Sequence, residues 1–88
     1  MPYINPKRRK ELNAYCGYPI QQMPAIETKG DLEYIVFLLM KKYMSSRPYK
    51  YSELHEVVYA VQHCADEFRR RYLDKREDEA RETNGDIE

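Results

Sequence analysis

The segment from Leu32 to Met44 constrains this 88-residue chain most, because it has almost no polar face in its middle. The apolar side chains of this segment are Leu32, Ile35, Val36, Phe37, Leu38, Leu39, Met40, Tyr43 and Met44. A helix that is apolar all round is buried on several sides. A domain of about 60 residues buries only ~60% of the surface that its unfolded chain exposes, so the rest of a short chain can hardly cover such a helix. We therefore expect other copies of the chain to cover it in a homo-oligomer.

The same run can be interpreted in two ways, since short apolar runs do not distinguish a helix from a buried strand. A strand would occupy residues 34–40. Two features favour a helix over residues 31–46, namely Lys41-Lys42 near the end and the terminating sequence Ser45-Ser46-Arg47-Pro48. Upstream, Thr28-Lys29-Gly30-Asp31 resembles a capping box with aspartate in the fourth position.

A second long helix is predicted over residues 52–83, with Ser52 as its N-cap and Asn84-Gly85 as its stop. Its apolar residues follow steps of three and four: Leu54, Val57, Val58, Val61, Cys64, Ala65, Phe68 and Tyr72. At ~1.5 Å per residue the helix would span about 46 Å, against a diameter near 30 Å for a compact chain of this length. Residues 74–82 are nearly all charged, so the last turns either project or pack on another chain, followed by a tail at 84–88.

At the N-terminus, Asn5-Pro6 is a favourable helix opening and predicts a short helix over residues 5–15. Gly17 can end this helix, and the glycines and prolines of residues 16–30 predict a long loop. The fold class is therefore all-α, in a single domain over residues 1–88. The two long helices are expected to form a hairpin that oligomerises.

Charge and composition exclude several classes of function. The 15 basic and 15 acidic residues cancel, so no global field attracts nucleic acid, and a DNA-binding role is not expected. The longest apolar run has seven residues, whereas a membrane-spanning helix needs about 20. No signal peptide is recognised at the start, which predicts a reducing compartment and free thiols at Cys16 and Cys64.

Catalytic patterns are absent from the sequence, so we expect no enzyme activity. No serine lies in a nucleophile elbow, and the three glycines are isolated rather than gathered in a phosphate loop. Cys16, His55, His63 and Cys64 are the weak candidates for a metal site. His55 and His63 would lie about 12 Å apart along a helix, too far to share one ion. We expect no metal and no cofactor.

Binding is the better-supported class, because nine tyrosines occur without a tryptophan and basic residues form two clusters. The clusters are Lys7–Lys10 and Arg69–Arg71, each of which is either an anion site or a solvated helix face with local ion pairs. Aromatic rings beside arginines suit a ligand with both a base and a phosphate. The predicted ligand-binding residues are Tyr3, Arg8, Arg9, Arg70 and Arg71.

Four motifs in order resemble a family of small proteins encoded by tailed bacteriophages. They are Met1-Pro2-Tyr3-Ile4 with Arg8-Arg9 and Leu12, Gly30-Asp31-Leu32-Glu33-Tyr34-Ile35, Glu67-Phe68-Arg69-Arg70-Arg71, and Glu77-Asp78-Glu79 with Asn84-Gly85-Asp86. The chain departs from the family at Arg69, where an aromatic residue is usual, and at Lys75-Arg76, where a Pro-Tyr pair is usual. These departures favour an unbroken helix here. The resemblance carries no activity, but it implies action in the cytoplasm of an infected bacterium.

Two functions follow as expectations. In the first, the helical oligomer sequesters a nucleotide, such as a cyclic nucleotide signal of bacterial immunity. In the second, the exposed C-terminal helix docks on a host or phage protein as an inhibitor or adaptor. Fold and size alone do not choose between them.

Overall fold

The computed structural model describes residues 4–88, which form helices and connecting segments without a β-strand, so the predicted all-α class is confirmed. The predicted order is also confirmed, with an N-terminal helical segment, a loop and two long helices. The elements are α1 (Pro6–Leu12), η1 (Asn13–Gly17), α2 (Tyr18–Gln22), α3 (Lys29–Met44), α4 (Tyr51–Phe68), η2 (Arg69–Leu73) and α5 (Asp74–Asn84). Backbone contacts divide the chain into two compact units, with the boundary between Tyr49 and Lys50.

The N-terminal helical segment is longer than predicted. Asn5 caps it as expected, because its Oδ1 accepts a hydrogen bond from the backbone N–H of Arg8 at 2.8 Å, and Pro6 follows in the first turn. The predicted loop over residues 16–30 is wrong for residues 16–22. Gly17 does not end a helix; its φ of −62° is helical, and it closes the π-helical turn η1. Pro19 lies in the first turn of α2, where a proline is tolerated.

Helix α3 begins two residues before the predicted start, at a complete capping box. The Thr28 Oγ1 accepts from the backbone N–H of Asp31 at 3.0 Å, and Oδ2 of Asp31 accepts from the backbone N–H of Thr28 at 3.3 Å. The helix ends at Met44, where the hydroxyl of Ser45 donates to the carbonyl oxygen of Lys42 at 2.7 Å. The alternative of a strand at 34–40 is therefore wrong. The connecting segment before α3 is short, over residues 23–28.

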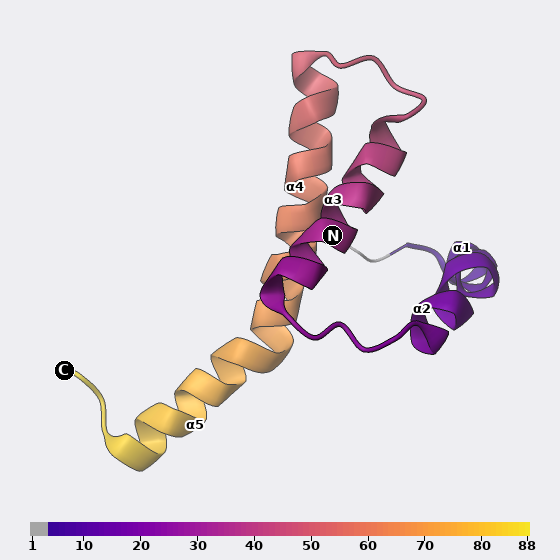
Figure 1. Ribbon diagram of the computed structural model, residues 1–88. Helices are drawn as coiled ribbons and strands as arrows, with labels where there is room; N and C mark the ends of the chain where they lie inside the picture. Colours follow the sequence, from indigo (N-terminus) through magenta and orange to yellow (C-terminus); the bar gives the residue numbers. More distant parts are fainter. Residues whose placement is uncertain (1–3) are drawn as a thin grey trace. The chain divides into compact units, whose positions relative to one another are not determined.

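The second long helix runs without a break from Tyr51 to Asn84 through α4, η2 and α5 (Figure 1). Ser52 was predicted as its N-cap, but that position is taken by Lys50, which caps with no side-chain hydrogen bond. The ribbon changes direction where η2 lies, as is usual at a π-helical turn. Gly85 ends the helix at a φ of 89°, with its N–H donating to the carbonyl oxygen of Arg81 at 2.8 Å.

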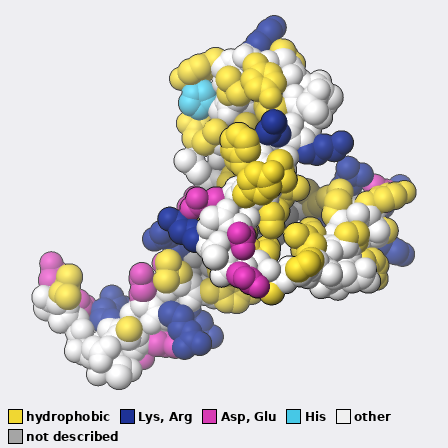
Figure 2. All heavy atoms as spheres, in the orientation of Figure 1, with side chains coloured by type: hydrophobic (Ala, Val, Ile, Leu, Met, Phe, Trp, Pro, Cys, Tyr) yellow, Lys and Arg dark blue, Asp and Glu magenta, His cyan; other side chains and the backbone are white. Residues whose placement is uncertain are grey.

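Two hydrophobic side chains, Met44 and Val57, are buried among the described residues. Most large apolar side chains are exposed, including Tyr34, Phe37 and Leu39 on α3 and Phe68 at the end of α4. Figure 2 shows hydrophobic side chains in yellow on the surface of the molecule, and the sequence of α5 is mostly charged. None of the described helices is long and apolar enough to cross a bilayer. The hairpin packing and the oligomer stay predictions.

Candidate functional site

One row of side chains follows the long helix at steps of four residues, from the start of α4 into η2. We call it the ridge, and its members are Tyr51, His55, Tyr59, His63, Glu67 and Arg71. Four residues make slightly more than one helical turn, so successive members are neighbours on the helix surface. The ridge therefore presents four rings followed by a carboxylate and a guanidinium in one row, which winds around the helix by about 40° at each step.

The four rings of the ridge contact one another in sequence. Tyr51 meets His55 edge to face, with ring centroids 4.2 Å apart and planes at 65°. His55 and Tyr59 lie 5.4 Å apart at 31°. Tyr59 and His63 lie 6.4 Å apart at 15°, which makes them nearly parallel. The planes thus become progressively more parallel toward the arginine end of the ridge.

The distance between the rings of Tyr59 and His63 determines whether a planar ligand can stack between them. Aromatic carbon atoms in van der Waals contact are about 3.5 Å apart, so two stacked contacts require about 7 Å. The centroid distance of 6.4 Å is an upper limit for the gap between the two ring planes, so a third planar ring fits between them only after one side chain rotates. Both side chains are exposed, so rotation of either one would open this ring slot from the solvent.

At the other end of the ridge, one carboxylate binds two guanidinium groups. Oε1 of Glu67 lies 2.6 Å from Nη2 of Arg70 and 2.6 Å from Nε of Arg71, and Oε2 lies 3.2 Å from Nε of Arg70. The side chain of Glu67 is 14% exposed, whereas both arginines are more than half exposed. The three groups carry one net positive charge. A guanidinium has five N–H donors in a planar fork, a geometry that suits carboxylate and phosphate oxygens.

The apolar side chains of α4 lie on the opposite face of the helix. Val57 is buried, and two residues further along the helix, about 200° around its axis, Tyr59 is half exposed. Phe68 and Tyr72 continue the apolar face, with their ring centroids 4.7 Å apart. Packing of the apolar face therefore leaves the ridge accessible.

The predicted site residues that the structure describes lie on two separate elements, η2 and α1. Arg70 and Arg71 are brought together on Glu67. Arg8 lies on α1, where its Nη1 pairs with Oε2 of Glu11 at 2.9 Å, and Arg9 is exposed on the same helix. Tyr3 lies outside the described residues. Arg8 and Arg9 belong to the N-terminal unit and Arg70 and Arg71 to the C-terminal unit, so a shared site stays a prediction.

The rings of the ridge were missed by the sequence analysis. His55 and His63 were considered only as metal ligands, where a spacing of eight residues counts against them. The signal that could have found the row is the insertion of Tyr51 and Tyr59 at the same four-residue spacing. Among residues 4–88, no group of three or more His, Cys, Asp or Glu side chains is placed to hold a metal ion.

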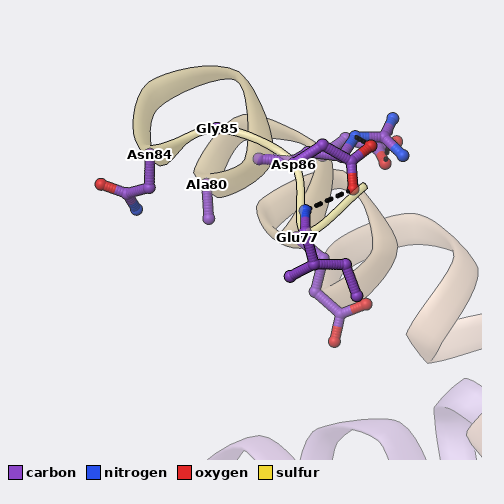
Figure 3. Close-up of a pocket in the computed structure, with 8 residues that line it drawn as sticks. Glu77, Ala80, Asn84, Gly85 and Asp86 are labelled. Atoms are coloured by element: carbon purple, nitrogen blue, oxygen red, sulfur yellow. Dashed lines mark hydrogen bonds and ion pairs between the residues drawn. The ribbon is translucent and has the colours of Figure 1, made fainter.

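A separate hollow of about 550 Å³ lies at the end of α5 (Figure 3). The tail turns back after Gly85 and places Asp86 over the helix, where Oδ1 of Asp86 accepts from the backbone N–H of Ile87 at 2.7 Å. Arg81 lies between two carboxylates of this hollow, 3.4 Å from Asp78 and 3.9 Å from Asp86. The hollow contains no predicted site residue, and three of the four charged residues that line it, Glu77, Asp78 and Asp86, are acidic. It is therefore a weaker candidate than the ridge.

The sequence of the chain matches a described protein family over residues 1–87, under the description Domain of unknown function (DUF6899). Because the match covers nearly the whole chain, the protein belongs to this family. No curated protein and no solved structure matches the chain.

Proposed function

We propose that this protein is a non-enzymatic phage accessory protein that binds and sequesters a nucleotide in a helical oligomer. The observation that carries the proposal is the ridge, where a slot between two nearly parallel rings precedes a pair of arginines on one exposed helix face. A ligand that contains both a planar base and a phosphate has the matching chemistry. Cyclic nucleotide signals of bacterial immunity are such ligands, and their removal would benefit a phage in the cytoplasm of its host.

The ring slot supplies the base-binding half of this site. Stacking of a base on an aromatic side chain contributes about 1–3 kcal/mol and tolerates any base, because every base has a π-face. Between Tyr59 and His63 a base would stack on both sides. The slot therefore favours a nucleobase over a free phosphate or a sugar phosphate.

The arginine pair supplies the phosphate-binding half. Side chains on a helix lean toward its N-terminus, so Arg70 and Arg71 lean toward His63 from about two turns further along. Guanidinium groups bind phosphate oxygens through two parallel hydrogen bonds. The base and the phosphate of one ligand would then lie along the helix rather than across it.

A single helix face cannot enclose a ligand, so sequestration needs a second wall. We propose that another subunit of the oligomer provides it, with Tyr3, Arg8 and Arg9 as its ligand-binding residues. This arrangement uses the basic start of α1, where no acidic side chain lies in the first turn to offset the helix dipole.

The test is native mass spectrometry of the intact protein, alone and with a panel of cyclic di- and oligonucleotides. We expect an oligomer that gains whole ligand masses in a fixed ratio to subunits. Tyr59→Ala and Arg70→Ala should each weaken binding by about fivefold or more, since each removes one contact of about 1–3 kcal/mol. Tyr15→Ala is the matched control, because Tyr15 is an exposed tyrosine on η1.

Two results would contradict the proposal. One is the absence of ligand mass with every nucleotide of the panel. The other is unchanged affinity in both Tyr59→Ala and Arg70→Ala, which would show that a bound nucleotide lies elsewhere on the chain.

A second candidate function is docking on a host or phage protein through α5. All residues of α5 are exposed, and its side chains pair along the helix, for example Arg76 with Glu79 at 3.8 Å. Such pairs support a helix that has no packing partner within its own chain. If docking is the function, truncation after Leu73 should abolish capture of the partner from infected cells while circular dichroism still reports helix.

A further inference from the structure

Several residues at equal distances before and after Asp74 carry opposite charges. Arg69, Arg70 and Arg71 lie three to five residues before Asp74, and Glu77, Asp78 and Glu79 lie three to five residues after it. Glu67 and Arg81, seven residues before and after Asp74, continue the pattern. A helix with this charge order is complementary to a reversed copy of itself.

We propose that two copies of the chain pair through η2 and the helix ends beside it, antiparallel, with a two-fold axis near Asp74. The proposal rests on the oligomer of the proposed function and gives it a surface and a direction. In such a pair the basic segment 69–71 lies at the same height along the axis as the acidic segment 77–79 of the second copy. The contact is isologous, so every favourable pair occurs twice.

The exposed apolar side chains at this place fit the same arrangement. Phe68 is 67% exposed, Tyr72 58% and Leu73 43%, although α5 beyond them is entirely polar except for Ala80. A reversed copy places the small side chain of Ala80 opposite Phe68, and Arg76 opposite Tyr72. A large ring then meets a small residue, and a guanidinium meets the face of a tyrosine, which is a favourable cation–π geometry.

The π-helical turn brings residues of this pairing surface onto one face of the helix. A π-helical turn holds one residue more than an α-helical turn, so the residues after η2 are displaced around the axis by about 100°. With this displacement Arg76 and Ala80 lie on the side of Phe68 and Tyr72. In an uninterrupted α-helix Ala80 would lie about 120° away from Phe68.

A second copy of the chain fits this surface better than a different protein, because the complementary charges belong to two segments of this same chain. The charge order therefore specifies both the partner and the register of the pairing. Parallel pairing is disfavoured, because it would place the three arginines of one copy beside those of the other. The ion pairs within one chain, such as Arg81 with Asp78 at 3.4 Å, are exposed and weak enough to rearrange.

The experiment is sedimentation velocity of the intact protein, without nucleotide, in three charge variants and the wild type. The first variant reverses the basic side (Arg69→Glu, Arg70→Glu, Arg71→Glu). The second reverses the acidic side (Glu77→Arg, Asp78→Arg, Glu79→Arg). The third carries all six substitutions. Circular dichroism checks that each variant keeps its helix content.

We expect the wild type to associate and each one-sided variant to raise the dissociation constant at least about tenfold, because like charges then face each other. The six-substitution variant should recover association, since its charges are exchanged but still complementary. An equimolar mixture of the two one-sided variants should also recover it.

Three results would overturn the antiparallel pairing: a wild type that stays monomeric, one-sided variants that associate like the wild type, or a six-substitution variant that stays dissociated. Failure of nucleotide binding leaves this test unaffected, because no nucleotide is present. Tyr59→Ala lies outside the pairing surface and should associate normally, which separates loss of the ligand from loss of the pair.

Discussion

The phenol ring of Tyr59 lies nearly parallel to the imidazole of His63, with the centroids 6.4 Å apart and the planes at 15°. The two residues are one turn apart on α4, so the helix itself sets their separation. Two exposed and nearly parallel rings on one helix offer stacking faces for a flat ligand once one ring rotates to admit it.

The first prediction concerns fluorescence, because the chain has no tryptophan. Tyr59→Trp introduces a single indole into the slot, where a stacked nucleobase should quench it strongly. Tyr51→Trp is the matched control, since that position is 80% exposed and meets its neighbour edge to face. Titration with a cyclic dinucleotide should quench the first variant and leave the second nearly unchanged. Equal quenching of both would argue against the slot.

The second prediction concerns the carboxylate that holds two arginines. Glu67→Gln keeps the shape of the side chain but removes its negative charge, so the net positive charge of the cluster with Arg70 and Arg71 rises by one. Affinity for a phosphate-bearing probe should rise severalfold. The free energy of unfolding should fall by about 1 kcal/mol or less, because ion pairs with exposed partners are screened. Isothermal titration and urea denaturation measure the two effects, and weaker phosphate binding would contradict the prediction.

The third prediction concerns Gly17, a glycine in a helical conformation. A Cβ at this position would come within 2.9 Å of Oδ1 of Asn13, which is the end of a flexible side chain that can move away. Gly17→Ala should therefore raise the free energy of unfolding by about 0.5–1 kcal/mol, as alanine favours helix over glycine. Gly85→Ala is the control, and its expected effect has the opposite sign. Its φ of 89° strains a Cβ, so that variant should lose order at the end of α5 in hydrogen exchange.

The fourth prediction concerns the capping box of α3. Thr28→Ala removes the side-chain acceptor for the backbone N–H of Asp31 and should lower the free energy of unfolding by about 1 kcal/mol. Ser45→Ala, at the other end of α3, removes only an exposed hydroxyl donor to the Lys42 carbonyl and should change stability much less. Thermal denaturation of the two variants gives the comparison. A larger effect of the serine would show that the box does not fix the start of the helix.

Helix type and order were predictable from periodicity, because amphipathic spacing and caps are local. Thr28 and Asp31 marked the start of α3 to within two residues, and Asn84-Gly85 marked the end of the long helix. The extent of the N-terminal segment was not predictable in this way. Gly17 and Pro19 were taken as helix breakers, but a π-helical turn accepts the glycine and the first turn of α2 accepts the proline.

The candidate site was predicted in part. Arg70 and Arg71 were selected from their charge, which the sequence displays directly, and their shared carboxylate follows from the spacing to Glu67. The ring slot was missed because its residues were examined one type at a time. Histidines were weighed as metal ligands and tyrosines as scattered contacts, so the alternation of the two at one spacing went unnoticed.

The π-helical turn η2 also has a consequence for the gene. A π-helical turn contains one residue more than an α-helical turn, so η2 corresponds to one additional codon between the α-helical segments α4 and α5. Deletion of a single codon within residues 69–73 would shorten the helix by only about 1.5 Å, yet it would turn everything beyond by about 100°. Such a deletion would leave a helix of nearly the same length and composition. The side chains of α5 would then point in other directions relative to those of α4. Length variation among relatives at this one position would therefore be a stronger sign of changed partners than any substitution on α5.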